Sequence, residues 1–178
     1  MWRDLNTQLF LLINASDHAS KLFISFAIFC ANYLAFLPII VLIIGGAINK
    51  NYRLLIIKIV VTLIVALSIT FLIRHLIYSP RPFALDIGTN YLYHDKTSSF
   101  PSQHAVFVWG ICCTIYFNYQ SQLKTLLYFC TIVALLVCWS RIYLGIHWPI
   151  DIVTGFLLSL ISAYIINKIW SLRANKSR

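Results

Sequence analysis

Residues 54–82 read LLIIKIVVTLIVALSITFLIRHLIYSPRP, a stretch that begins as hydrocarbon and ends in positive charge. Within residues 54–73, Lys58 is the one charged side chain, and a helix of about 20 mostly apolar residues crosses the hydrocarbon core of a bilayer. The end of the stretch places Arg74 and Arg81 beside two prolines. Arginine at the end of an apolar span either reaches lipid headgroups or serves an anionic partner. The stretch therefore predicts a membrane span with a polar site at its end.

Further apolar runs predict an all-α fold, a polytopic membrane helix bundle. The chain has 178 residues, of which 60% are hydrophobic, and its five acidic residues are all aspartates, which is far from the composition of a soluble domain. We therefore expect residues 1–178 to form a single integral-membrane domain with about five transmembrane helices. The expected spans are residues 22–48, 54–73, 105–119, 126–139 and 149–170.

The two ends of the chain and its longest polar connection are expected outside the spans. Residues 5–13 are apolar but too short to cross a bilayer, and no small-residue cleavage site follows them, so residues 1–21 are expected to hold a short interfacial helix. Residues 79–100 are expected to form an outward loop beside the site, and residues 171–178 a basic cytoplasmic tail. Five cysteines fall inside the expected spans and form neither a disulfide framework nor a metal-binding pattern.

Five spans divide the loops into two groups, and basic residues favour one of them. Eight lysines and arginines fall on the face that carries the C-terminus, and six fall on the other face together with all five aspartates. By the positive-inside rule the first face is cytoplasmic. The net charge of +9 would also suit a nucleic acid, but these charges flank spans and do not cluster with aromatic platforms on a soluble surface. Membrane lipids are the expected partners, and no nucleic acid is.

Three polar segments share the outward end of the expected bundle. They are residues 74–82 (RHLIYSPRP), residues 100–104 (FPSQH) and residues 140–151 (SRIYLGIHWPID). The three are far apart in sequence, but alternation of the spans brings their ends to the same side. The topology alone therefore predicts that they converge.

Each segment has chemistry suited to an anion, alongside a plainer structural reading. In FPSQH, Ser102 is placed to open a helix whose N-terminal amides bind phosphoryl oxygens, with His104 in the first turn. Asp151 follows His147 by four residues, so its carboxylate can hold the proton on one ring nitrogen and leave the other nucleophilic. The alternatives are that Arg74 and Arg141 reach lipid headgroups and that the serine and aspartate only cap helices.

The charges of the three segments do not balance. Three arginines, two histidines and one aspartate surround a common space, so the missing partner is a multiply charged anion. Guanidinium forks match the geometry of phosphate oxygens. A metal site is disfavoured, because metals take neutral imidazoles and carboxylates as ligands.

These residues resemble the three signature motifs of the type-2 phosphatidic acid phosphatase superfamily. The matching patterns, in the family's order, are R-x6-RP (Arg74, Arg81, Pro82), PSQH (Pro101, Ser102, Gln103, His104) and SR-x5-H-x3-D (Ser140, Arg141, His147, Asp151). Two positions depart from the usual motifs. Arg74 stands where the family most often has lysine, and Gln103 stands where it most often has glycine.

The resemblance implies a metal-independent, cofactor-free phosphatase that works through a phosphohistidine. His147 would attack phosphorus, Asp151 would orient it, and His104 would protonate the leaving oxygen and later activate water. Phosphate oxygens would be bound by Arg74, Arg81, Ser102 and Arg141, supported by Pro82, Pro101, Gln103 and Ser140. The short N-terminal stretch, the five spans and the outward site resemble the small enzymes of the bacterial cytoplasmic membrane that hydrolyse undecaprenyl diphosphate.

Other functions share parts of this pattern. The enzymatic alternatives are a phosphatidylglycerophosphate or phosphatidate phosphatase, a lipid A phosphatase, and a transferase with the same phosphohistidine. A non-enzymatic lipid-phosphate binder or transporter would be expected to lack a motif histidine, and both are present. Haloperoxidases share the phosphate-pocket chemistry in a soluble fold, which five spans disfavour. The sequence makes no prediction of oligomeric state.

Overall fold

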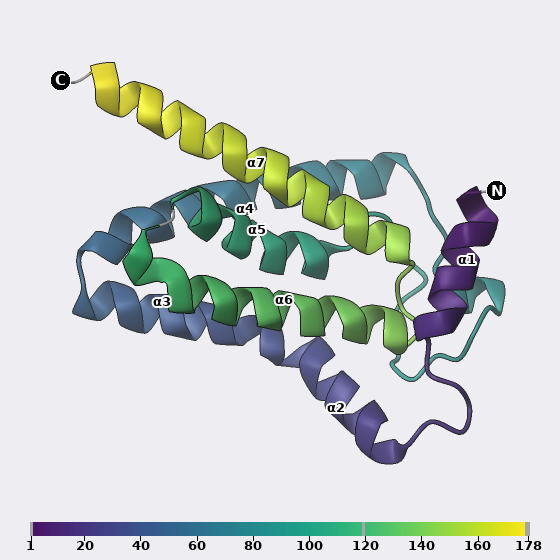
Figure 1. Cartoon of the computed structure of the whole chain (residues 1–178). Coiled ribbons are helices and arrows are strands. Elements are labelled where there is room, and N and C mark those ends of the chain that lie inside the picture. Colours follow the sequence, from purple (N-terminus) through teal and green to yellow (C-terminus); the bar gives the residue numbers. More distant parts are fainter. Residues whose placement is uncertain (1, 119, 177–178) are drawn as a thin grey trace.

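The computed structural model describes residues 2–118 and 120–176, and every regular element in these ranges is helical (Figure 1). The all-α helix bundle expected from the sequence is confirmed. The helices are α1 (Trp2–Ile13), α2 (Lys21–Asn32), α3 (Leu37–Ile48), α4 (Asn51–Leu76), α5 (Gln103–Phe117), α6 (Lys124–Tyr143) and α7 (Pro149–Lys176), with short 3-10 turns η1 (Leu34–Phe36), η2 (Pro82–Leu85) and η3 (Ser121–Leu123).

Within the part of the chain that the structure describes, four stretches are long and apolar enough to cross a membrane, and α5 is a shorter apolar helix. The four are Lys21–Ile48, Tyr52–Leu76, Ser121–Tyr143 and Pro149–Arg173. The outer faces of these helices carry large exposed apolar side chains, such as Ile48 and Phe71. A surface of this kind suits hydrocarbon and not water.

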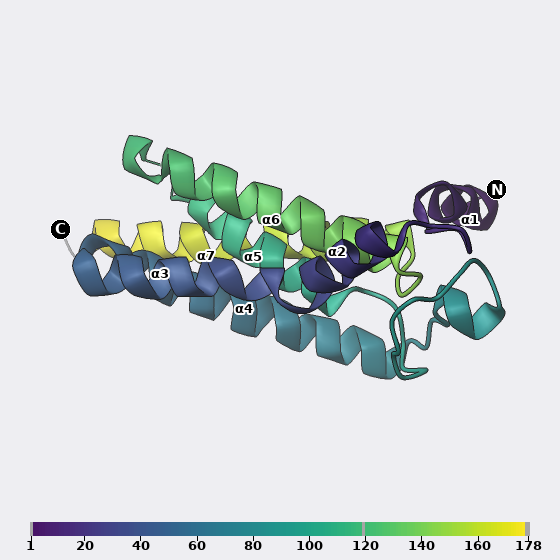
Figure 2. The ribbon, with the colours of Figure 1, turned by 90° about the horizontal axis from the view of Figure 1, so that it is seen from below.

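The first expected span, residues 22–48, is divided into two helices. The α2 helix ends at Asn32, the turn η1 follows, and α3 then continues to Ile48. Pro38 lies in the first turn of α3, where a helix does not need the N–H that proline lacks. Because Pro38 cannot donate a hydrogen bond to the turn before it, the helix of α2 does not continue through this position. The break lets α2 pack against α6 while α3 turns away to run beside α4 (Figure 2).

Helix α5 is the centre of the bundle. Figures 1 and 2 show it enclosed by α4, α6 and α7, and nine of its residues are buried. The contact with α7 is close, because a Cβ at Gly155 would lie 2.9 Å from the Cβ of Ala105. Ser159 of α7 donates a hydrogen bond of 2.8 Å to the carbonyl of Val106. An enclosed helix does not need to match the bilayer thickness, so 15 residues suffice. Tyr119, the last residue of the expected span 105–119, lies outside the described residues.

Helix α1 lies across one end of the bundle, and Figure 2 views it end-on. Its Phe10 is fully buried, with its ring centroid 5.1 Å from that of Trp148. Asn6 accepts a hydrogen bond of 3.1 Å from the backbone N–H of Ile150, in the first turn of α7. The short helix expected in residues 1–21 is therefore present, and its place at the membrane interface stays a prediction. At the other end, residues 171–176 of the expected tail continue helix α7, and residues 177–178 lie outside the described residues.

The side chain of Asn14, just after α1, joins three segments. Its amide nitrogen donates to the carbonyls of Thr89 (2.9 Å) and Tyr143 (3.0 Å), and its oxygen accepts from the N–H of Thr89 (2.7 Å). Asn14 therefore attaches the loop between α4 and α5 to the end of α6.

We predict that Asn14→Ala lowers the free energy of unfolding by about 2 kcal/mol, because three partly buried backbone groups lose their partner. Thermal unfolding of the detergent-purified protein checks this. Asn90→Ala is the matched control, since the Asn90 side chain bonds only to the N–H of Leu92, two residues away, in an exposed position. Equal unfolding temperatures for the two variants would contradict the role assigned to Asn14.

Candidate active site

The three polar segments meet at the end of the bundle that α1 covers. The guanidinium of Arg81 lies 3.3 Å from the ring of His147, joining the first segment to the third. Arg74, in the last turn of α4, donates 3.1 Å to the carbonyl of Pro101, joining the first to the second. The N–H of Ser102 donates 3.2 Å to the carbonyl of Asp151, joining the second to the third. The convergence expected from topology is therefore present in the structure.

His147 and Asp151 form a buried pair whose geometry defines the histidine tautomer. Nδ1 of His147 lies 3.1 Å from Oδ2 of Asp151, and the side chains are 2% and 0% exposed. Nε2 faces Nη1 of Arg81, which can only donate a hydrogen bond. Nε2 is therefore the unprotonated nitrogen, whose lone pair accepts from Arg81, and Nδ1 carries the proton. This is the arrangement that a nucleophilic imidazole requires.

The carboxylate of Asp151 organises the groups around it. Its Oδ2 also accepts from the backbone N–H of Trp148 at 2.9 Å and from the hydroxyl of Ser99 in a short hydrogen bond. Its Oδ1 is buried without a hydrogen-bond partner among the described residues. Asp151 lies in the first turn of α7, where the helix dipole favours negative charge. These contacts fix the orientation of His147.

Arg81 is buried with one side against backbone carbonyls. It is 2% exposed, and it donates to the carbonyls of Thr97 (3.1 Å), Ile146 (3.0 Å) and Ser98 (3.4 Å). Burial, followed by repulsion from Arg74, lowers the pKa of Arg81 to about 10, so it remains a cation at neutral pH. The hydrogen bonds to these carbonyls hold the guanidinium of Arg81 against Nε2 of His147.

A cationic wall is formed by Arg81 together with Arg74 and Arg141. Arg74 donates to the carbonyls of Ser99 and Pro101 at 3.2 and 3.1 Å. Arg141, near the end of α6, is 3% exposed and donates to the carbonyl of Ala31 at 3.5 Å. The Nε of Arg141 is buried and has no partner in the described parts of the chain. A buried guanidinium with an unsatisfied N–H favours the binding of an anion at that N–H.

Helix α5 begins at this wall. Ser102 is its N-cap, and its hydroxyl accepts from the N–H of Ala105 at 3.5 Å. The backbone N–H of Ser102 is engaged with Asp151, so the hydroxyl and the following amides are the groups left for an anion. Gln103 is exposed and opens the helix as its first residue, so the departure from glycine does not prevent the turn. His104, half-buried in the first turn, is close enough to Arg141, His147 and Arg81 for their charges to act on it.

Three of the residues expected to support the site act through backbone hydrogen bonds. The hydroxyl of Ser140 donates 2.7 Å to the carbonyl of Val137 within its own helix. Pro82 is buried at the start of η2, and its carbonyl accepts from the N–H of Ile87 at 3.2 Å. Pro101 contributes its carbonyl to Arg74.

Three residues near the site make contacts that the sequence did not predict. Ser99 bonds to Asp151, and its hydroxyl also lies 3.3 Å from Nδ1 of His147. Thr97 accepts from Arg74 and Arg81 at 3.5 and 3.4 Å. Gly145 has a φ of +82°, and a Cβ there would collide with the carbonyl oxygen of Thr89, so glycine is needed where the loop crosses the turn before His147. The only sequence signal was the run of small hydroxyl residues before Pro101.

The arrangement can bind and attack a phosphoryl group. Within residues 2–118 and 120–176 no group of three or more His, Cys, Asp or Glu is placed to hold a metal ion. Three guanidiniums and a helix N-terminus lie around the neutral imidazole of His147. Its unprotonated nitrogen, Nε2, faces the guanidinium of Arg81. The donors suit the equatorial oxygens of a phosphoryl group, and the imidazole suits its phosphorus.

Comparison with known proteins gives a consistent result. The model of the PAP2 superfamily matches residues 55–174. YbjG of Escherichia coli strain K12, whose name provisionally describes it as an undecaprenyl-diphosphatase, is 33% identical over 99% of this chain and 88% of its own length. An undecaprenyl-diphosphatase of Sulfolobus acidocaldarius is 29% identical over 86% of this chain and 72% of its own length. The crystal structure of LpxE from Aquifex aeolicus superposes with a TM-score of 0.71 at 25% identity, over 92% of this chain and 95% of that one.

The site predicts a pH dependence of stability. Burial, followed by repulsion from Arg81 and Arg141, holds the pKa of His147 well below its ordinary 6.5. The unfolded chain therefore takes up a proton at His147 below about pH 6.5 while the folded protein does not. The contribution of His147 to the free energy of unfolding therefore falls as pH falls through this range, by at most about 1.4 kcal/mol per pH unit.

We predict that His147→Gln weakens this pH dependence. Unfolding temperatures of wild type and variant, measured in detergent between pH 7 and pH 5, check it. The wild type should lose more stability over the interval than the variant does. Parallel curves would mean that His147 protonates equally in the folded and unfolded states.

Proposed function

The chain belongs to the PAP2 superfamily, and we propose that it is a membrane lipid phosphatase that hydrolyses undecaprenyl diphosphate to undecaprenyl phosphate and phosphate. The apolar helices make it an integral membrane protein. The observation that carries the proposal is the position of the His147 ring. The buried contact with Asp151 holds its unprotonated nitrogen, Nε2, beside Arg81.

The first chemical step is an attack by Nε2 of His147 on the terminal phosphorus. A bond forms between nitrogen and phosphorus, and the bond from phosphorus to the bridging oxygen breaks. His104 gives its proton to that oxygen as undecaprenyl phosphate leaves. Asp151 stabilises the positive charge that develops on the imidazole and keeps the ring in place.

The second step regenerates the enzyme. His104, now neutral, takes a proton from a water molecule that attacks the phosphohistidine. The nitrogen–phosphorus bond breaks, inorganic phosphate leaves, and His147 returns to its neutral tautomer. Each residue therefore ends the cycle in the protonation state in which it began.

The arginines stabilise the charge on the three equatorial oxygens. Arg81 already touches the attacking nitrogen, so the phosphorus must approach beside its Nη1. The unpaired Nε of Arg141 gains its partner when phosphate binds. In many phosphoryl-transfer sites a magnesium ion supplies this positive charge. With three guanidiniums present, we expect turnover to persist in EDTA.

The preference for a diphosphate is supported by the names of the relatives and by the loop over the site. The hydroxyls of Ser98 and Ser99 have partners within the protein, at the carbonyl of Ile77 and at Asp151. Lys96 and the second ring nitrogen of His94 remain as groups for a second phosphate, and the Thr97 hydroxyl, which accepts from Arg74 and Arg81, can still donate to it. Burial and the charge of Arg81 lower the pKa of His94, which agrees with a position close to the cationic wall.

We predict that kcat/KM for undecaprenyl diphosphate exceeds that for phosphatidate and for phosphatidylglycerophosphate, when all three are compared in one detergent. A diphosphate can engage loop groups that a phosphomonoester leaves idle, and one hydrogen bond to a charged group is worth about 1.5–3 kcal/mol, or roughly tenfold or more. Lys96→Gln should reduce the diphosphate rate more than the phosphatidate rate. If either glycerolipid equalled the prenyl substrate, the assignment to undecaprenyl diphosphate would fail and the lipid phosphatase class would stand.

We also propose that the protein lies in the bacterial cytoplasmic membrane, with its site facing the periplasm or exterior and its C-terminus in the cytoplasm. The excess of basic residues at the end opposite the site supports this orientation.

An impermeant thiol reagent tests the orientation in intact cells. We predict that Thr89→Cys, in the loop beside the site, is labelled from outside, while Asn175→Cys at the end of α7 reacts only after lysis. The five native cysteines are buried and should contribute little background. The reverse labelling pattern would invert the topology.

A further inference from the structure

The end of the bundle opposite the active site has two adjoining cavities. One has a volume of about 550 Å³ and polar walls that include Lys50, Lys58 and Asn118. The other has a volume of about 560 Å³ and mostly apolar walls from α3 and α6, which include Gly45 of α3 and Phe129 of α6. The walls of both include Tyr52 and Gln122. Together they form a site with a polar compartment and an apolar one.

The polar compartment has a positive charge that no acidic side chain balances. The ammonium of Lys58 donates to the amide oxygens of Asn118 (2.5 Å) and Asn167 (3.2 Å), which are neutral. The five aspartates of the chain are residues 4, 17, 86, 95 and 151, and they belong to α1, the loops beside the active site and the first turn of α7. The opposite end therefore has cations and no acidic side chain. An anion from outside the chain is the missing partner.

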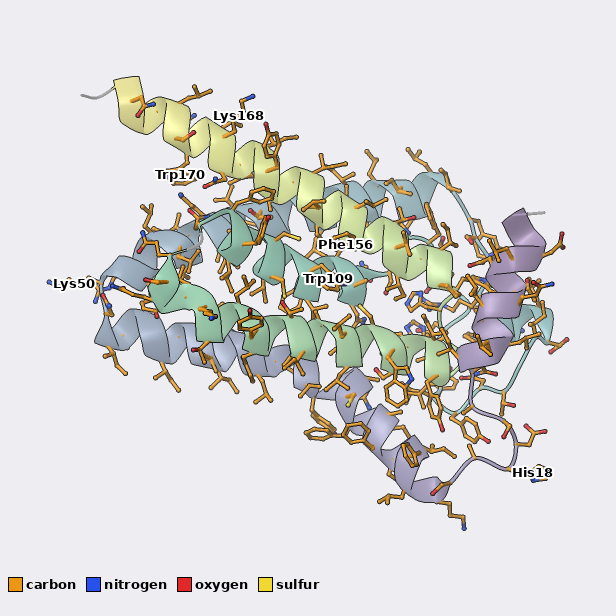
Figure 3. The ribbon with its side chains drawn as sticks, viewed as in Figure 1. His18, Lys50, Trp109, Phe156, Lys168 and Trp170 are labelled. Carbon is orange, nitrogen blue, oxygen red and sulfur yellow. The ribbon has the colours of Figure 1, made fainter. Side chains whose placement is uncertain are left out.

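The polar compartment lies at the depth of lipid headgroups. Lys58 precedes Arg74 by 16 residues along α4, which at 1.5 Å per residue is roughly 24 Å of the ~30 Å hydrocarbon thickness. Figure 3 shows Lys50 at the far end of the bundle, where α3 passes into α4, with Lys168 at the same end on α7. The apolar compartment extends from this level along α3 and α6 toward the bilayer centre.

We propose that the two cavities bind one anionic phospholipid from the leaflet opposite the active site. The headgroup phosphate lies in the polar compartment beside Lys50 and Lys58, and an acyl chain lies in the apolar compartment against Gly45 and Phe129. Basic pockets between transmembrane helices bind anionic headgroups in this way. The site is separate from the phosphatase site and does not depend on the proposed reaction.

Native mass spectrometry of the delipidated protein in detergent, titrated with phosphatidylglycerol, tests the proposal. Wild type should bind one phosphatidylglycerol in preference to phosphatidylcholine of the same chain length. Lys50→Gln should weaken binding on the order of fivefold, and Lys58→Gln should add a similar loss. Lys50 is exposed, so the first variant folds even if loss of the Lys58 contacts destabilises the bundle. Lys168→Gln is the matched control, with the same charge change at the same end but outside both cavities.

Gly45→Leu tests the apolar compartment. The nearest atoms to a Cβ at this position are in the ring of Tyr52, the closest at 3.5 Å, which is an ordinary van der Waals contact, so we expect the larger side chain to fit by filling the groove. Binding of phosphatidylglycerol should fall while the fold is kept.

Four outcomes would overturn the proposal. They are equal binding of the two lipids, equal loss in the Lys50 and Lys168 variants, unchanged binding in Gly45→Leu, and displacement of the lipid by millimolar inorganic phosphate alone. Because binding is measured without substrate, none of these results bears on the phosphatase reaction.

Discussion

The buried hydrogen bond between His147 and Asp151 is the contact on which the site depends. Asp151 receives the imidazole N–H, the backbone N–H of Trp148 and the hydroxyl of Ser99, and its own carbonyl accepts from Ser102. One residue in the first turn of α7 therefore positions the ring of His147, the loop over the site and the start of α5. Any change that moves this carboxylate must move all three.

The same end of the bundle carries unbalanced positive charge. Arg81 and Arg141 are nearly fully buried, and their hydrogen-bond partners among the described residues are backbone carbonyls, the Thr97 hydroxyl and a histidine nitrogen, none of which is an anion. Carbonyl dipoles offset part of the desolvation cost of a guanidinium but leave its charge. We expect an anionic group bound beside these guanidiniums to offset the rest of that cost. Such a pocket lowers the stability of the folded protein and raises its affinity for an anion.

Much of the fold follows from local sequence. Apolar length predicted the spans, and alternation of the spans predicted that Arg74, His104 and His147 would share one end. The spacing of His147 and Asp151 predicted their contact, because residues four apart meet on one helical face or turn.

Other features depend on tertiary contacts that no local pattern encodes. The division of residues 22–48 depends on how α3 packs against α4 and α6, and Pro38 alone was a weak signal for it. Ser99 gains its role because an irregular loop folds back onto Asp151, and loops have no periodicity to read. Asn14 acts across 75 residues on Thr89, a contact that only the assembled bundle creates.

The central claim is that Nε2 of His147 forms a covalent bond to phosphorus, and trapping the intermediate tests it most directly. Purified protein is mixed with undecaprenyl diphosphate labelled at its terminal phosphate, quenched within milliseconds under alkaline denaturing conditions, and mapped by mass spectrometry. The account predicts acid-labile phosphate on the peptide that contains His147, and none in His147→Ala. Label on His104 or on an aspartate, or full turnover by His147→Ala, would contradict it.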